Sequence, residues 1–113
     1  MPTFEQGDEV KVPFPGPDRP VRRYRPALVI FAEGTATAHC LLWVSMITSA
    51  ENRGWSGDVP VSNLGAAGLP APSVVRTARI ATIDASHATR IGRLSGSPHE
   101  KVIGSICREI GCS

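Results

Sequence analysis

The chain has 113 residues, which is enough for one compact domain with a single core over residues 1–113 but too few for two. It carries 12 lysine and arginine residues against 10 aspartate and glutamate residues, and this net charge of +2 does not by itself indicate any class of partner. Three cysteines without a Cys-x-x-Cys pair argue against a disulfide framework or zinc finger, and neither a signal peptide nor the roughly 20 apolar residues of a membrane-spanning helix occurs, so we expect a cytoplasmic protein.

The first predicted element is a strand from Asp8 to Phe14. Val10 and Val12 alternate there with polar positions, a pattern typical of a strand with one buried and one exposed face. The next segment, Pro15 to Tyr24, is rich in proline and predicts a loop that does not join a central sheet.

Two nearly continuous apolar runs follow, at Ala27 to Ala32 and at about Cys40 to Thr48. Such runs predict strands that are covered on both faces, or a strongly coiled sheet that closes on itself. Trp43 lies in the second run, and we expect it in the core. The polar segment Ser49 to Gly54 then predicts a loop.

The second half of the chain predicts two more strands. A short one is expected at Asp58 to Val61, and a segment rich in glycine, alanine and proline follows from Gly65 to Pro72. A longer strand is expected from Ser73 to Ile83, where apolar and polar residues alternate imperfectly. This irregularity indicates a bulge or bend.

The clearest helix is at the C-terminal end. Ser97, Pro98 and Glu100 provide an N-cap, a first-turn proline and a capping-box acid, and Gly111 ends the pattern. The apolar residues at helical spacing, which predict the packed face, are Val102, Ile103, Ile106, Cys107 and Ile110. Five short strands and one terminal helix predict a mainly β protein of the α+β class, a small SH3-like barrel with a C-terminal helix.

Arginines are concentrated before the second strand. Arg19, Arg22, Arg23 and Arg25 fall within one seven-residue stretch. Arginine makes forked contacts to phosphate, so the cluster is a candidate nucleic-acid surface, while a solvated loop explains it equally well.

Nucleophilic catalysis with a histidine base is not indicated. The spacing couples none of His39, His87 and His99 to a serine or cysteine. His, Cys, Asp and Glu do not cluster at the spacing of metal ligands, so we expect no metal and no cofactor.

Two strand ends suggest a phosphate site instead. Arg25 and Pro26 stand where the basic segment enters a strand, and Thr48 and Ser49 stand where an apolar strand leaves the core. A polar group at a strand end is rigidly held yet open to ligand. The alternative is a strand-flanking cation and ordinary strand-ending hydroxyls.

Five segments together carry a resemblance to a known family. They are Gly7-Asp8, Arg25 to Ile30, Ile47-Thr48-Ser49, Gly68-Leu69 before Ser73-Val74-Val75, and Thr82-Ile83-Asp84 leading to Ile91-Gly92 and Leu94. In this order and spacing, across nearly the whole chain, the sequence resembles the PemK/MazF growth inhibitors. One such segment alone would be weak evidence, but five in series are specific.

The resemblance implies a fold and an activity. The family fold is an SH3-like barrel with a C-terminal helix, shared with the CcdB gyrase poison. Family members resemble one another as homodimeric, sequence-specific, metal-independent endoribonucleases that a cognate antitoxin neutralises, the toxins of type II toxin–antitoxin systems. The family's catalytic arginine falls on Arg25, and its catalytic threonine falls on Thr48.

Further residues are expected to bind single-stranded RNA. Trp55 is the first candidate for stacking on a base, with Tyr24 as the second. One departure concerns an arginine that family members often carry near the end of the long strand, where this chain has Ala81: either Arg79 replaces it or that RNA contact is lost. The full set of expected substrate-binding residues is Arg19, Arg22, Arg23, Ser49, Trp55, Ser73 and Arg79.

By analogy with the family, the ribose 2′-hydroxyl attacks the neighbouring phosphate and leaves a 2′,3′-cyclic phosphate. We expect Arg25 to hold charge rather than transfer protons, because a guanidinium group is a poor base at neutral pH. Two alternatives remain. One is a toxin of the same fold that poisons a protein target such as gyrase, and the other is a noncatalytic RNA- or DNA-binding module.

Overall fold

The computed structural model describes residues 4–15, 22–32, 41–52, 57–61, 64–94 and 96–111. Within this part of the chain, one antiparallel sheet of six strands has the order β4-β5-β3-β2-β1-β6. The strands are β1 (Asp8–Pro15), β2 (Arg22–Ala32), β3 (Leu41–Ser49), β4 (Val59–Pro60), β5 (Ser73–Asp84) and β6 (Thr89–Arg93). The helices are η1 (Ala50–Asn52), α1 (Leu64–Ala67), η2 (Ala85–His87) and α2 (Ser97–Ile110). The predicted class, mainly β with a C-terminal helix, is confirmed.

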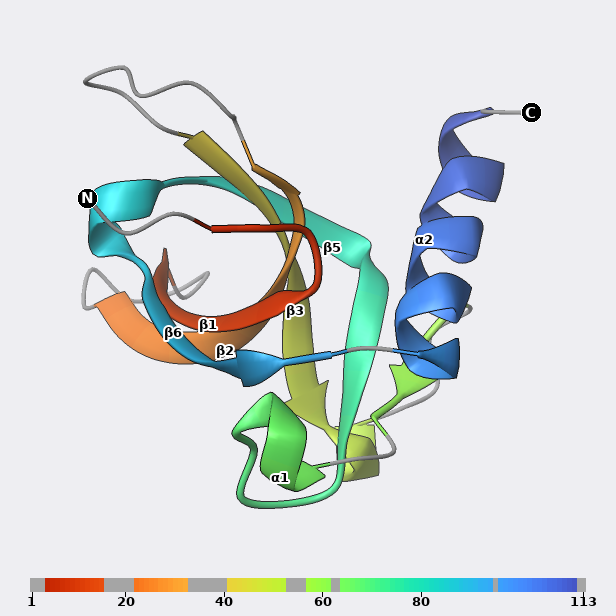
Figure 1. Ribbon diagram of the computed structural model, residues 1–113, viewed down its shortest axis with the longest axis horizontal. Helices are drawn as coiled ribbons and strands as arrows, with labels where there is room; N and C mark the ends of the chain where they lie inside the picture. Colours follow the sequence, from red (N-terminus) through yellow and green to blue (C-terminus); the bar gives the residue numbers. More distant parts are fainter. Residues whose placement is uncertain are drawn as a thin grey trace.

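The sheet curls strongly at β1, β2 and β6, as Figure 1 shows, and forms a half-barrel. Register shifts bend the ladders between β1 and β6, β2 and β3, and β3 and β5. In the last ladder Ser45 faces Ile80 while the next residue, Met46, faces Arg76, so β5 has extra residues between these two pairs. This confirms the irregularity predicted for the long strand.

Apolar side chains gather on both faces of the sheet. On the inner face of the curl, buried residues of β1, β2 and β3 such as Val10, Val29 and Val44 form one cluster. On the outer face, which α1 and α2 cover, Leu28 and others pack against Val102 of α2 and Ala67 of α1. Two-sided cover explains the continuous apolar runs in β2 and β3.

The C-terminal helix agrees with the sequence except at its first residue and its last turn. Gly111 ends it with φ of 80° and donates its N–H to the carbonyl of Cys107, a conformation that glycine adopts without strain. Ser97 is the first helical residue and Gly96 the N-cap, without a side-chain cap hydrogen bond, so the predicted Ser97 cap is wrong. Ile110 is 69% exposed because α2 extends past the sheet there, which corrects its assignment to the packed face.

Further predictions are wrong because they depend on partners distant in sequence. β2 begins at Arg22, where it pairs with Pro15 of β1, so the predicted loop is shorter. β6 and α1 were not predicted, since their residues show no clear periodicity. Trp43 is 48% exposed and does not belong to the core, because none of the described helices covers its end of β3. Within the described residues, no helix is long and apolar enough to cross a membrane.

Candidate active site

Arg25 and Thr48 lie on the same face of the sheet. The ladder between β2 and β3 reaches Ala27 and Met46 as its last pair at this end, and both side chains belong to the inner core. Arg25 and Thr48 each stand two residues beyond that pair, so alternation directs both to the inner face. Arg25 is exposed and Thr48 is half-buried. The structure therefore places the two predicted residues at one open end of the inner core.

Two serines accompany Thr48 at this end. Ser49 pairs with Ser73 of β5, next to the pair of Thr48 and Val74. The Ser49 Oγ accepts a hydrogen bond from the Glu51 N–H at 3.3 Å, and the Ser73 Oγ donates to the Ala71 carbonyl at 2.8 Å. Both hydroxyls thus stabilise local turns, and their predicted contact with RNA would have to coexist with these bonds.

Four of the side chains predicted to bind RNA are not among those that the structure describes. Arg19 and Trp55 fall outside the described residues. The backbones of Arg22 and Arg23 belong to β2 and pair with Pro15 and Phe14, while their side chains are not described. Arg22 and Arg23 therefore precede Arg25 in the same strand.

The structure does not bring Arg79 to Thr48. Arg79 is exposed and lies in the irregular part of β5, next to Ile80, which pairs with Ser45. Thr48 lies three residues further along β3 than Ser45, a distance of about 10 Å along a strand. Ala81, at the position of the expected family arginine, packs half-buried against the inner core.

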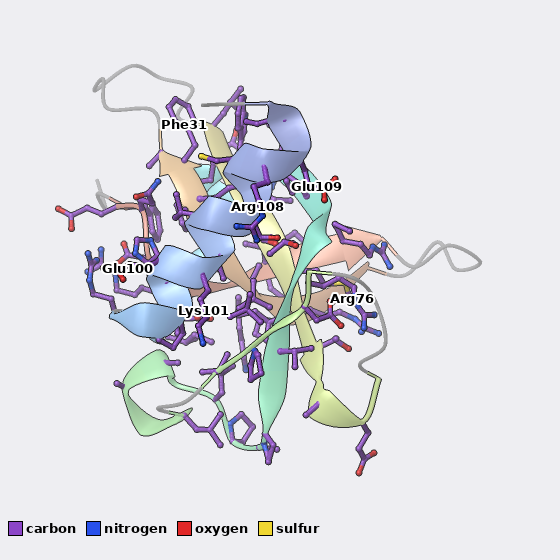
Figure 2. The ribbon with its side chains drawn as sticks, turned by 90° about the vertical axis from the view of Figure 1, so that its right-hand side faces the viewer. Phe31, Arg76, Glu100, Lys101, Arg108 and Glu109 are labelled. Carbon is purple, nitrogen blue, oxygen red and sulfur yellow. The ribbon has the colours of Figure 1, made fainter. Side chains whose placement is uncertain are left out.

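A second guanidinium group lies closer to Thr48. Arg76 stands opposite Met46 on the inner face, two residues from Val74, the partner of Thr48. Its Nε and Nη2 donate to the two carboxylate oxygens of Asp58 at 3.2 and 2.9 Å, and the side chains are only 9% and 8% exposed. Figure 2 shows Arg76 where β4 meets β5. Sequence reasoning missed this pair because no spacing rule joins residues 58 and 76.

Asp8, from the first segment of the family resemblance, has a structural role. Its buried carboxylate accepts hydrogen bonds from Arg90 at 2.6 Å, from Arg93 at 2.9 Å and from the Glu5 N–H at 2.9 Å. The neighbouring Gly7 donates its N–H to the Val29 carbonyl, and its own carbonyl accepts a hydrogen bond from the Leu94 N–H. These contacts fasten β6 to β1 and do not form part of a reaction site.

Glu9 was predicted on the exposed face of its strand and is fully buried instead. Neither of its carboxylate oxygens has a hydrogen-bond partner in the described part of the chain, and burial raises the pKa of Glu9 from 4.5 to about 8. The cause is α1: Glu9 faces Gly92 of β6, and a Cβ on Gly92 would lie 2.3 Å from the backbone of Ala67. The α1 segment therefore covers a face that the sequence pattern indicates as solvated.

The described histidines show no catalytic arrangement. Burial lowers the pKa of His99, the charge of Arg93 lowers it further, and Glu100 opposes this shift. The His99 Nε2 is buried and has no hydrogen-bond partner among the described residues, while His87 is exposed in η2. No three His, Cys, Asp or Glu side chains of the described ranges gather as a metal site.

Comparison with protein families gives one match that spans most of the chain. Residues 5–109 match the model of the PemK-like, MazF-like toxin of type II toxin–antitoxin systems. No curated protein matches the chain significantly.

Solved structures are similar over nearly the full length. MazF (Form-I) from Deinococcus radiodurans is 20% identical, covers 98% of this chain and 99% of its own, and superposes with a TM-score of 0.75. MazE-MazF (Form-II) from the same organism is 20% identical, with 100% of both chains covered and a TM-score of 0.74. The Mycobacterium tuberculosis toxin MazF-mt6 is 25% identical over 92% of this chain and 97% of its own, with a TM-score of 0.67.

Proposed function

The chain belongs to the PemK-like, MazF-like toxin family of type II toxin–antitoxin systems, and from that premise we propose that it is a sequence-specific endoribonuclease that cleaves single-stranded RNA at Arg25 and Thr48. The observation that carries the proposal is the joint position of these residues, on one face and two residues beyond the last β2–β3 pair. Arg25 is exposed there, so a phosphate can reach it.

The proposed reaction is an internal transfer of the phosphoryl group. The ribose 2′-oxygen bonds to the adjacent phosphorus and its proton passes to water. The bond between phosphorus and the 5′-oxygen of the next nucleotide breaks, and this oxygen takes up a proton from water. The products are a 2′,3′-cyclic phosphate and a 5′-hydroxyl, and the arrangement of residues requires no metal ion. The pentavalent intermediate carries added negative charge, which the Arg25 fork stabilises with the Thr48 hydroxyl as a further donor.

The direct test is incubation of the purified protein with RNA in excess chelator. We expect fragments that end in 2′,3′-cyclic phosphates, and mapping of their 5′ ends gives the cleavage sequence. RNA that stays intact and unbound would contradict the proposal and favour a toxin that acts on a protein such as gyrase. RNA that is bound but intact would favour a noncatalytic RNA- or DNA-binding module.

We also propose a cognate antitoxin as partner. Solved relatives from Deinococcus radiodurans are MazE-MazF complexes. The sequence of β2 begins with three arginines, Arg22, Arg23 and Arg25. An acidic segment that folds on binding would complement their positive charge. Such a segment would block RNA at the same surface, in the cytoplasm where the RNA target occurs.

The proposed homodimer would form through an apolar patch on the outer face of the sheet. Phe31, Leu41, Trp43 and Ile80 are each between 42% and 48% exposed, and the register places them on one face. The rings of Phe31 and Trp43 are 5.0 Å apart. A patch of this kind is typical of a self-complementary interface with a second copy.

A further inference from the structure

A groove of about 610 Å³ lies on the outer face of the sheet, away from the apolar patch. One wall consists of Lys11 of β1 and of Tyr24 and Pro26 of β2, and Lys11 stands directly opposite Pro26. The other wall is α1 with the segment that follows it, including Leu69, and Figure 1 shows α1 at this end of the molecule. The volume is within the range of sites for small molecules or single nucleotides.

The lining has the chemistry of a site for a flat, anionic ligand. Among the residues that the structure describes, no aspartate or glutamate lines the groove, and the exposed Lys11 supplies a positive charge. Tyr24 is 63% exposed, so its ring is free to stack on another ring system. Gly65 and Gly68 contribute no side chains and leave the opposite wall smooth. Nucleic acid bases stack on exposed aromatic rings, while lysine attracts their phosphates.

The groove adjoins the proposed catalytic arginine. Tyr24 and Pro26 flank Arg25 in sequence, at Cα distances of about 3.8 Å, and their side chains point to the face opposite that of Arg25. The ladder with β3 ends at Ala27, so no described strand covers this edge of β2 at residues 22–26. An RNA chain at Arg25 can therefore turn over the edge and enter the groove.

We infer that the groove is a subsite for a nucleotide next to the scissile phosphate, with its base against Tyr24 and Pro26 and its phosphate near Lys11. The inference rests on the proposed function for its place on the RNA. It adds a residue pair that strengthens the binding of RNA at a site separate from the reacting atoms.

The test measures binding separately from cleavage. The probe is a fluorescent pool of randomised ten-nucleotide RNA with every 2′-hydroxyl methylated, which no attack by the 2′-oxygen can cleave. Tyr24→Ala should weaken binding about tenfold, since stacking on one aromatic ring has effects of this order. Tyr24→Phe should bind like the parent because the ring is kept.

Lysine provides a second, independent variant. Lys11→Gln should reduce the slope of log binding constant against log salt concentration by about 0.7, the value for one phosphate of a single strand. Lys101→Gln is the matched control, because Lys101 is also exposed but lies on α2, as Figure 2 shows. Its slope should equal that of the parent. Circular dichroism verifies that each variant is folded.

The outcomes separate this inference from the proposed nuclease. If the parent does not cleave RNA but binds the methylated pool in a way that depends on Tyr24 and Lys11, the nuclease proposal fails and the subsite stands. Parent-like affinity and salt slope in both variants overturn the subsite. The same is true if both variants bind RNA normally but lose affinity for the antitoxin, since the groove would then be a peptide site.

Discussion

Arg25 of β2 and Arg76 of β5 lie on the inner face of the sheet, on either side of β3, and they differ in burial and in hydrogen bonding. Arg76 is nearly buried and donates two hydrogen bonds to Asp58, whereas Arg25 is exposed beside a strand edge that no described strand covers. A buried guanidinium needs a fixed carboxylate, because its desolvation is otherwise unfavourable. Arg76 therefore stabilises the fold, while Arg25 is available for an anionic substrate.

Removal of Asp58 should have the largest effect. Asp58→Ala leaves Arg76 without its carboxylate, and we expect the free energy of unfolding to fall by roughly 3–5 kcal/mol in urea denaturation. The double variant Asp58→Leu/Arg76→Leu should recover most of this loss, because both charges are then absent. An Asp58→Ala protein as stable as the parent would contradict the structural role.

Removal of Arg25 should show the opposite profile. Arg25→Ala is expected to lower the cleavage rate on the order of 10²-fold or more, since charge on the phosphorane loses its main stabilising group. The urea midpoint should not change, because the side chain is exposed. Arg108→Ala on the exposed side of α2 is the control and should cleave like the parent. Parent-like cleavage by Arg25→Ala would end the proposed role.

Glu9 is another buried ionisable group, and its carboxyl has no hydrogen-bond partner among the described residues. Its pKa is raised to about 8 in the fold, from 4.5, so the folded chain holds the proton more tightly than the unfolded chain does. The contribution of Glu9 to the free energy of unfolding should therefore be complete below the unfolded pKa of 4.5. It should fall by about 1.4 kcal/mol per pH unit as the pH rises to the folded pKa of about 8. Glu9→Gln should remove this slope in denaturation series across that window. An identical slope in both proteins would show that Glu9 is not its source.

The smallest effect is expected at the apolar patch, which is proposed to form the dimer and has no role in the ion pair of Arg76 or in catalysis by Arg25. Trp43→Ser should raise the dissociation constant of the dimer by about tenfold or more, because large aromatic residues dominate such interfaces. Trp43→Phe is the matched control. Sedimentation over a range of concentrations measures both. A parent protein that stays monomeric throughout would refute the interface.

Local signals in the sequence were sufficient for the elements that depend on nearby residues. The end of α2 at Gly111 and the irregularity of β5 follow from patterns within a few residues of each other. Glu9 and Trp43 were assigned to the wrong environments because α1 covers one and nothing described covers the other, and neither fact is local. Hydrophobic pattern cannot report which distant segment packs on a strand.

The same distinction applies to the site. Arg25 and Thr48 could be selected as strand-end residues, and the family resemblance singled them out, but their common face depends on the pairing of Ala27 with Met46. The pair of Arg76 and Asp58 had no signal, because two strands that meet only in the fold bring it together. The sequence leaves Arg79 open as a replacement for the family arginine, but the irregular part of β5 separates it from Thr48.

The contact between α1 and β6 has a consequence for how this protein can evolve. A Cβ on Gly68 would lie 1.9 Å from the carbonyl oxygen of Ile91, and a Cβ on Gly92 would lie 2.3 Å from the carbonyl carbon of Ala67, so the two main chains are in direct contact. The distance between β6 and the segment of α1 and Gly68 is therefore set by main-chain atoms and not by side chains. Tyr24 and Pro70, the exposed apolar side chains of the groove, are therefore free to change while its width stays constant, whereas Leu64 and Leu69 also pack in the core. Descendants of this chain could acquire new nucleotide preferences by changing that lining and keeping the frame.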